Sequence, residues 1–278
     1  MIRLNEVTYH YPRATAPALA DLSLEIPTGQ LCAVIGANGA GKSTLCYTLA
    51  GFVPHFYRGE LAGSITVAGI DVAQSSLAEL AGHVGLVFSN PFNQITGARF
   101  TVADEVAFGL ENLGVPPDEM RARIDNILHF AGLYEERERS PFALSGGQQQ
   151  RLAIASVLVM QPRVIVLDEP TSQLDPVGAK EVFSVLHELA AANESTIVMA
   201  EHKLEWIAVF ADRVLVLKDG RLVADGPPGD ILTADNLSEF GLEPTQYTKA
   251  ARAVVTAGLR AGNKALPATL EEAVEFLR

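Results

Sequence analysis

One stretch of the chain has the residues and the spacing of a phosphate-binding loop. It fits the pattern G-x-x-x-x-G-K-[ST] and consists of Gly36, Ala37, Asn38, Gly39, Ala40, Gly41, Lys42, Ser43 and Thr44. Glycines let consecutive backbone N–H groups turn inward around a phosphate, and the N-terminus of a following helix adds its dipole. We expect Lys42 to reach the β- and γ-phosphates of a nucleotide, and the Ser43 hydroxyl to bind Mg²⁺. The complete spacing argues against the alternative, a glycine-rich turn that only happens to precede a helix.

Two carboxylates follow an apolar run much later in the chain. The run 164–167 is typical of a buried parallel strand and leads directly into Asp168 and Glu169. At such a strand end, Asp168 is placed to hold Mg²⁺ and Glu169 to polarise an attacking water. Another strand, 196–200, ends close to His202, and this position favours contact with a γ-phosphate over a packing role.

A serine and two glycines stand at the start of a helix that continues to Met160. The residues are Ser145, Gly146, Gly147 and Gln148. A hydroxyl, free N–H groups and a helix dipole pointing one way make an anion site. The same residues could equally form an N-cap after a loop, and taken alone they leave both interpretations open.

A polar loop opens where the strand predicted at 84–88 ends. It begins at Ser89 and reaches Gln94. Ligand chemistry in α/β sheets is placed at strand ends of this kind.

The elements that must position these residues alternate between short buried strands and helices, which predicts an α/β fold. The sequence favours buried strands at 31–35, 84–88, 164–167 and 196–200, and helices at 43–50 and 178–191. Around them we expect edge strands within 1–30, a hairpin-like insertion within 52–72, helices within 101–142, a hairpin at 214–223 and two helices in the tail, through about 259 and at 270–278.

Composition excludes several classes of protein. The 278 residues carry a formal net charge of −12, which argues against nucleic-acid binding as the main task. No apolar run is long enough to predict a transmembrane helix, and the first residues lack a signal-peptide core. Cys32 and Cys46 fit small buried residues better than a disulfide.

Taken together and in this order, the phosphate loop, the polar strand-end loop, Leu144–Gln148, the strand ending in Asp168-Glu169 and the strand-end His202 closely resemble the ATP-binding cassette (ABC) ATPases. The resemblance covers residues 1 to about 225. It implies a P-loop NTPase (RecA-like) core with an antiparallel β subdomain and a helical subdomain at about 90–160, followed by a helical extension at 226–278.

The family also implies roles that the residues alone do not establish. Leu144–Gln148 is the signature motif, which faces the phosphate loop of a second subunit, so that two ATP molecules lie at a dimer interface. Tyr11 becomes the aromatic that stacks on the base, although Tyr11 could instead only pack in a sheet. Asp175 becomes the interface aspartate and His202 the γ-phosphate switch.

Within the family, the ATPases of energy-coupling-factor (ECF) importers are the most similar. The resemblance lies in the segments 87–94 and 104–114, in Gln148–Arg151 and in the tail after Gly241. It implies a peripheral subunit on the cytoplasmic face of the membrane that hydrolyses Mg²⁺-ATP and drives uptake of a vitamin, a vitamin precursor or a transition-metal ion. Its partners would be a second ABC ATPase, identical or paralogous, and integral membrane subunits.

One position departs from the family pattern. Where the family has glutamine directly after the Val-Phe strand end, this chain has Ser89, and Gln94 takes over only if the loop folds back. Ser89 leaves open a half-site whose catalytic residues are completed by a paralogous subunit. A second alternative is a soluble ABC ATPase that acts outside transport.

Overall fold

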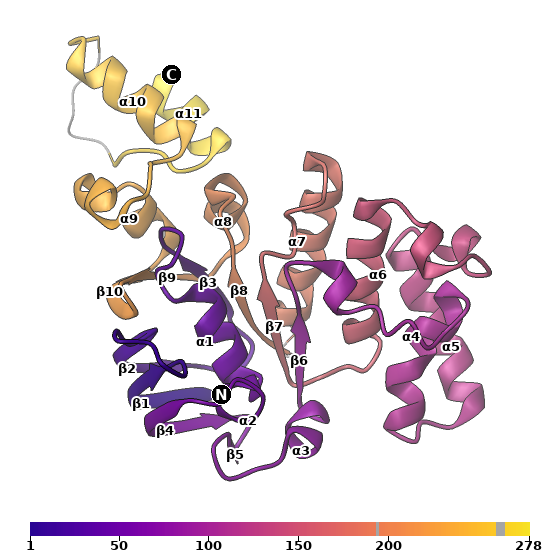
Figure 1. Ribbon diagram of the computed structural model, residues 1–278. Coiled ribbons are helices and arrows are strands. Elements are labelled where there is room, and N and C mark those ends of the chain that lie inside the picture. Colours follow the sequence, from indigo (N-terminus) through magenta and orange to yellow (C-terminus); the bar gives the residue numbers. More distant parts are fainter. Residues whose placement is uncertain (193–194, 260–264) are drawn as a thin grey trace.

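A six-stranded sheet forms the centre of the molecule (Figure 1). The computed structural model describes residues 1–192, 195–259 and 265–278. The strand order is β10-β9-β3-β8-β7-β6, and all neighbours are parallel except the hairpin partners β9 and β10. The strands are β3 (Leu31–Ile35), β6 (Val84–Val87), β7 (Val164–Asp168), β8 (Thr196–Ala200), β9 (Arg213–Lys218) and β10 (Arg221–Gly226). The predicted buried strands and the hairpin turn at Asp219-Gly220 are confirmed.

The central sheet is buried on both faces because successive side chains alternate between two cores. Cys32 and Val34 of β3 point into the core that α1 (Lys42–Leu49) shares with a second sheet. Leu31, Ala33 and Ile35 point into the opposite core, which is covered by α6, α7 and α8. These helices span Gly146–Leu158, Pro176–Ala191 and Leu204–Phe210. Both cysteines are buried and free, as predicted.

The second sheet is antiparallel and has the order β2-β1-β4-β5. Its strands are β1 (Ile2–His10), β2 (Leu19–Ile26), β4 (Glu60–Val67) and β5 (Ile70–Asp71), and two short helices adjoin them, α2 (Phe52–His55) and α3 (Leu77–Ala81). The strands predicted within 1–30 and the hairpin insertion thus form one sheet, which packs over α1. The expectation of edge strands holds for β2 but is wrong for β1, which pairs with β2 on one side and β4 on the other.

Residues 91–158 form a helical part with a core of its own, at the edge of the central sheet beyond β6 (Figure 1). It contains η1 (Pro91–Asn93), α4 (Val102–Asn112), α5 (Pro117–Phe130), η2 (Tyr134–Glu136), η3 (Pro141–Ala143) and α6. Val106, Leu110, Leu128 and Leu152 are fully buried between α4, α5 and α6. Thr101 caps α4 by accepting the N–H of Asp104.

The tail packs beyond β9 and β10 and also reaches the phosphate loop. It comprises α9 (Pro228–Leu232), η4 (Asp235–Phe240), α10 (Gln246–Thr256) and α11 (Leu270–Leu277), of which α9 is absent from the sequence prediction. Lys218 Nζ donates to the Glu239 carbonyl at 2.9 Å, and a Cβ on Gly241 would lie 3.1 Å from that of Ala37. Over the ranges that the structure describes, we find no helix with the length and apolarity needed to cross a membrane.

Candidate functional site

The phosphate loop joins β3 to α1 at the carboxyl edge of the central sheet. Gly36 has φ +156°, and a Cβ there would lie 2.3 Å from the carbonyl oxygen of Leu217 in β9. Gly41 has φ +104°, and its Cβ would lie 2.6 Å from the Ala18 carbonyl. Because both positions combine a left-handed backbone with close backbone neighbours, only glycine fits the loop there.

The backbone of the phosphate loop holds the Lys42 side chain across the loop. Its side chain is almost fully buried, and Nζ donates to the carbonyls of Gly36 at 2.9 Å and Ala37 at 3.2 Å. An ammonium has three protons, so one remains for a phosphate oxygen. Burial lowers the pKa of Lys42, while the nearby carboxylates of Glu169 and Asp168 act in the opposite direction.

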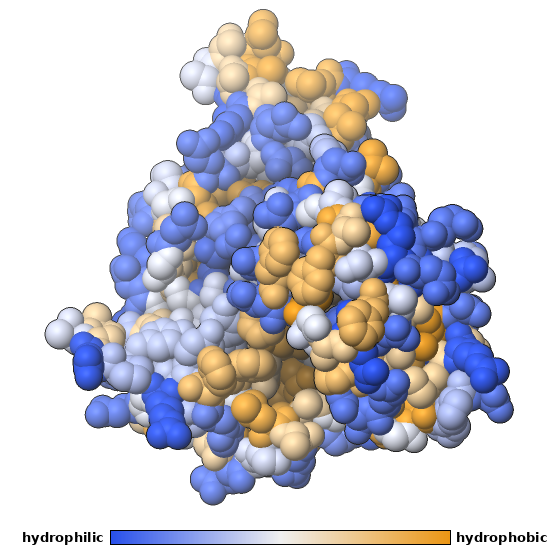
Figure 2. Space-filling view, turned by 45° about the vertical axis from the view of Figure 1, so that its right-hand side comes forward, coloured by the Kyte–Doolittle hydropathy of each residue, from blue (hydrophilic) through white to orange (hydrophobic). Residues whose placement is uncertain are grey.

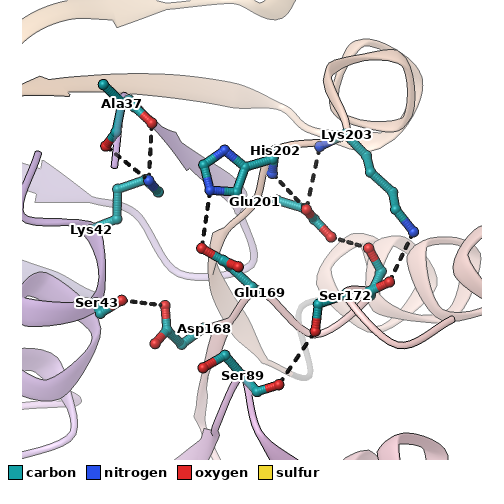
Figure 3. Close-up of polar contacts among 12 residues, drawn as sticks. Ala37, Lys42, Ser43, Ser89, Asp168, Glu169, Ser172, Glu201, His202 and Lys203 are labelled. Atoms are coloured by element: carbon teal, nitrogen blue, oxygen red, sulfur yellow. Dashed lines mark hydrogen bonds and ion pairs between the residues drawn. The ribbon is translucent and has the colours of Figure 1, made fainter. Parts of the chain in front are cut away.

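Ser43 and Asp168 meet although they lie far apart in the sequence. The Ser43 hydroxyl donates to Asp168 Oδ1 at 2.9 Å (Figure 3). The Tyr47 hydroxyl donates to Asp168 Oδ2 at 3.4 Å. Burial raises the pKa of Asp168, and the hydrogen bond from Ser43 opposes that rise. Sequence reasoning missed Tyr47; its place one helical turn after Ser43 was the available signal.

The Ser43 hydroxyl and the Asp168 carboxylate fit a Mg²⁺ ion. Mg²⁺ prefers hard oxygen ligands and is usually bound by one or two carboxylates together with substrate phosphates and water. Asp168 and Ser43 supply a carboxylate and a hydroxyl beside the phosphate loop. No group of three or more His, Cys, Asp or Glu side chains within the described ranges could hold a metal by itself, so phosphate oxygens and water would complete the ligand set.

Glu169 and His202 face each other at neighbouring strand ends, close to Lys42 in Figure 3. His202 Nε2 lies 3.0 Å from Glu169 Oε1, and both side chains are partly open to solvent. Glu169 has a left-handed backbone with φ 50°, which is strained for a residue with a side chain. A carboxylate held in this way can orient a water molecule and accept its proton.

The loop after β6 does fold back, and its two candidate residues make different contacts. Gln94 Oε1 accepts the N–H of Phe88 at 3.3 Å, so the amide oxygen is engaged at the strand end. The Ser89 carbonyl accepts the hydroxyl of Ser172, a residue of the turn after Glu169, at 3.3 Å. Ser89 therefore touches the turn after Glu169 through its backbone carbonyl. Whether Ser89 or Gln94 takes the role of the family's glutamine is not decided by these contacts.

Tyr11 lies beside the phosphate loop. Its hydroxyl is 3.2 Å from Thr44 Oγ1, and its ring packs edge-on against Tyr9 with centroids 4.9 Å apart. The ring is half-buried, and stacking on a base stays a prediction.

The residues from Ser145 onward start α6 with a capping box. Gln148 N–H donates to the Ser145 hydroxyl at 3.4 Å, and Ser145 N–H donates to Gln148 Oε1 at 2.9 Å. A Cβ on Gly147 would lie 3.3 Å from the Gln173 carbonyl, so this helix start borders the turn after Glu169. Asp175 ends that turn and caps α7 by accepting the Gly178 N–H at 2.7 Å. The geometry observed at Ser145 is thus the N-cap that the sequence left open, and binding of an anion there stays a prediction.

Comparison with known proteins gives consistent matches. Residues 19–172 match the protein family described as "ABC transporter". A putative ABC transporter ATP-binding protein of Pyrococcus abyssi is 46% identical over 88% of this chain and 88% of its own length. An energy-coupling factor transporter ATP-binding protein of Caldanaerobacter subterraneus is 39% identical over 100% of this chain and 98% of its own length. Other curated relatives are longer, and the chain spans between 41% and 46% of their length.

Solved structures agree in fold. The structure of cbiO1 from Clostridium perfringens, described as part of the ABC transporter complex cbiONQ, is 33% identical with a TM-score of 0.73. The alignment covers 92% of this chain and 94% of that one. The ATP-binding cassette MJ0796, a dimer bound to ADP and Pi after hydrolysis, is 28% identical with a TM-score of 0.73, covering 82% and 99% of the two chains.

Proposed function

This chain belongs to the ABC transporter family and is an ATPase, and we propose that it is the peripheral ATPase subunit of an ECF-type importer. Relatives named as energy-coupling factor and cbiONQ components support the importer assignment. The cargo would be a vitamin, a vitamin precursor or a transition-metal ion. The subunit would act at the cytoplasmic face of the membrane.

The observation that carries the dimeric part of the proposal is the placement of the phosphate loop and of the helix start at Ser145. Ser145 borders the turn after Glu169, whereas the phosphate loop precedes α1 on the other face of the sheet. Because the two sites belong to opposite faces of the sheet, one ATP molecule cannot place its phosphates at both sites of a single chain. Two copies facing each other would let Ser145 of one complete the phosphate loop of the other, as in a symmetric dimer.

Hydrolysis then follows from the residues at the sheet edge. The loop amides and Lys42 hold the β- and γ-phosphates, and this positioning provides most of the catalysis in phosphoryl transfer. Bound Mg²⁺ would neutralise developing charge next to Ser43 and Asp168. Glu169 accepts a proton from the attacking water, and His202 orients Glu169 and contacts the γ-phosphate. Binding of ATP closes the dimer and hydrolysis reopens it.

Mixing two inactive variants tests whether Ser145 acts on the ATP of a partner. Lys42→Ala and Ser145→Arg should each abolish ATPase activity alone. In a mixed dimer the two changes fall in the same composite site, so the other site stays intact. An equimolar mixture should recover about a quarter of wild-type activity, because half of the randomly paired dimers carry one working site of two.

A mixture as inactive as its components would contradict a symmetric dimer of this chain. It would favour the half-site alternative, in which a paralogue supplies the second cassette and Ser89 marks the weaker site. The matched control mixes two batches of Lys42→Ala, which share the same defect and should stay inactive.

An apolar groove lies between the helical part and the central sheet. Its volume is about 480 Å³, and its lining includes Phe52, Leu77, Phe88, Phe108, Leu113 and Met160. Figure 2, which brings the helical part forward, shows apolar side chains gathered around a recess in the middle of this face. Exposed apolar groups of this kind mark interaction surfaces. We assign the groove to a membrane subunit, because Gln94 lines it and links it to the strand end at Phe88.

A charge placed in this groove should uncouple the ATPase from the membrane. Leu113 is 44% exposed, so Leu113→Glu should fold and hydrolyse ATP, yet recovery of membrane subunits with the tagged chain should fall at least about tenfold because the new carboxylate would be buried unpaired. Val209→Glu is the control, since Val209 is 48% exposed on α8 outside the groove. Co-purification from native membranes and identification of the recovered proteins measures this, and also identifies the importer.

Equal recovery of membrane proteins by both variants would contradict the groove assignment. Recovery of no membrane protein by the wild-type chain would contradict the importer role itself and favour a soluble ABC ATPase.

A further inference from the structure

Two charged residues flank His202 and both bond to the turn that follows Glu169. They are Glu201 and Lys203, and the turn is Thr171–Leu174. Figure 3 shows the Glu201 and Lys203 side chains pointing toward this turn, whereas the His202 side chain points the opposite way, toward Glu169. In this view the two side chains thus point away from Lys42, and His202 points toward the side where Lys42 lies.

Glu201 is a buried carboxylate whose oxygens all have donors. The Thr171 hydroxyl donates to Oε1, and the backbone N–H groups of His202 and Lys203 donate to Oε2 at 2.6 and 3.3 Å. Glu201 is 3% exposed and Thr171 is fully buried. Burying a carboxylate is costly unless hydrogen bonds satisfy it, so this arrangement holds the three donors tightly around one group.

Lys203 binds the backbone of the same turn. Its Nζ donates to the Thr171 carbonyl at 2.9 Å and to the Leu174 carbonyl at 3.4 Å. Glu201 therefore accepts a hydrogen bond from the side chain of Thr171, while Lys203 donates to the backbone at both ends of the turn. We call these two residues the bracket.

The turn that the bracket holds lies between Glu169 and Asp175. Glu169 precedes it, and the Ser172 N–H donates to the Glu169 carbonyl at 3.2 Å. Asp175 follows it and is the predicted interface residue. The Glu169 N–H also donates to the Ala200 carbonyl at 2.9 Å, so the two strand ends are joined through the sheet as well. The bracket adds a second connection, which runs from the His202 backbone to the turn between Glu169 and Asp175.

We propose that Glu201 and Lys203 are positioning residues for ATP hydrolysis, which keep His202 Nε2 and Glu169 Oε1 at contact distance while the two subunits close and open. The proposal rests on ATP hydrolysis by this chain and is independent of the importer role. The catalytic pair sits on two separate strand ends, and a shift of about 1 Å between such groups can cost about a hundredfold in rate. The hydrogen bonds of the bracket restrict such a shift, and neither Glu201 nor Lys203 contacts the nucleotide.

Removing the Lys203 donors tests the proposal. Lys203→Met keeps the length of the side chain but not the ammonium, and it should lower kcat for ATP by about 10- to 100-fold. KM for ATP should stay within about twofold, because the phosphate loop binds the nucleotide elsewhere. Lys203→Arg, which can still donate to both carbonyls, should restore most of the rate. Lys180→Met, at an exposed lysine of α7, is the control and should behave as wild type.

A double-mutant cycle shows whether Lys203 acts through His202. His202→Ala alone should reduce single-turnover hydrolysis, and adding Lys203→Met to it should cause little further loss, since the group to be positioned is gone. Glu201→Gln is the second probe: its amide oxygen can accept from both backbone N–H groups only if its NH2 group faces the Thr171 hydroxyl, which reverses that hydrogen bond and removes the charge. It should lower kcat in the same way and show the same loss of effect in the His202→Ala background.

The assays use the full chain in the complex with which it co-purifies, and thermal unfolding is measured in parallel. A kcat for Lys203→Met within twofold of wild type would overturn the proposal. So would effects of Lys203→Met and His202→Ala that multiply, or a loss of rate explained by a lower Tm or by weaker ATP binding. These kinetic results do not depend on the importer assignment, because the rate of each variant is compared with the wild-type rate of ATP hydrolysis.

Discussion

Replacing Glu169 with glutamine should abolish hydrolysis while leaving ATP binding intact. The amide keeps the shape of the side chain and its contact with His202, but it cannot accept a proton from water. A general base contributes about 10²- to 10⁴-fold, so hydrolysis should fall by about that factor. In the proposed cycle ATP binding closes the dimer and hydrolysis reopens it, so the variant should accumulate as an ATP-bound dimer. Phosphate release and light scattering with and without ATP measure the two effects.

Glu181→Gln is the matched control for this substitution. Glu181 is an exposed carboxylate on α7, and its replacement should change neither the rate nor the oligomeric state. A Glu169→Gln variant that hydrolyses ATP at close to the wild-type rate would show that another group accepts the proton.

Lys42→Ala should lose ATP binding. The substitution removes the positive charge that faces the β- and γ-phosphates, and it leaves the carbonyls of Gly36 and Ala37 without their donor. A hydrogen bond to a charged group contributes about 1.5 to 3 kcal/mol, so the Kd for ATP should rise by at least about tenfold, and by about a hundredfold at the upper end of that range. Calorimetric titration with ATP measures the affinity directly.

Lys218→Ala separates this effect from a general loss of charge near the loop. Lys218 lies on the outer side of the phosphate loop, where Nζ donates to the Glu239 carbonyl. The Lys218→Ala variant should bind ATP about as tightly as wild type. Unchanged affinity in Lys42→Ala would contradict the role of the phosphate loop as the nucleotide site.

The sequence predicted those parts of the site that are encoded locally. The phosphate loop, the Asp168-Glu169 strand end and the helix start at Ser145 each lie within a few neighbouring residues, so residue type and spacing were enough. Which strand ends become neighbours depends on the order of the sheet, and the α/β pattern predicts only that polar strand ends gather at one edge.

Contacts between distant residues could not be predicted in the same way. Tyr47 touches Asp168 across 121 positions, and Thr171 meets Glu201 across 30. Neither contact follows from hydrophobic period or turn chemistry, because each depends on how two strands pair and how their loops bend. Gln94 is a third case: its fold-back was conceivable from the sequence, but the backbone N–H of Phe88 as its partner was not.

The strand order has a consequence for how the protein is made. β8 lies between β3 and β7, so the phosphate loop and Asp168 come to opposite sides of a strand that is synthesised after both. Ser43 and Asp168 are 125 positions apart, and His202 follows β8 directly. A nascent chain that ends before Ala200 has no complete sheet edge, and nucleotide can stabilise only a state that binds it. Because β8 must be inserted between β3 and β7 before Ser43 and Asp168 meet, we expect ATP to stabilise only chains that extend beyond Ala200.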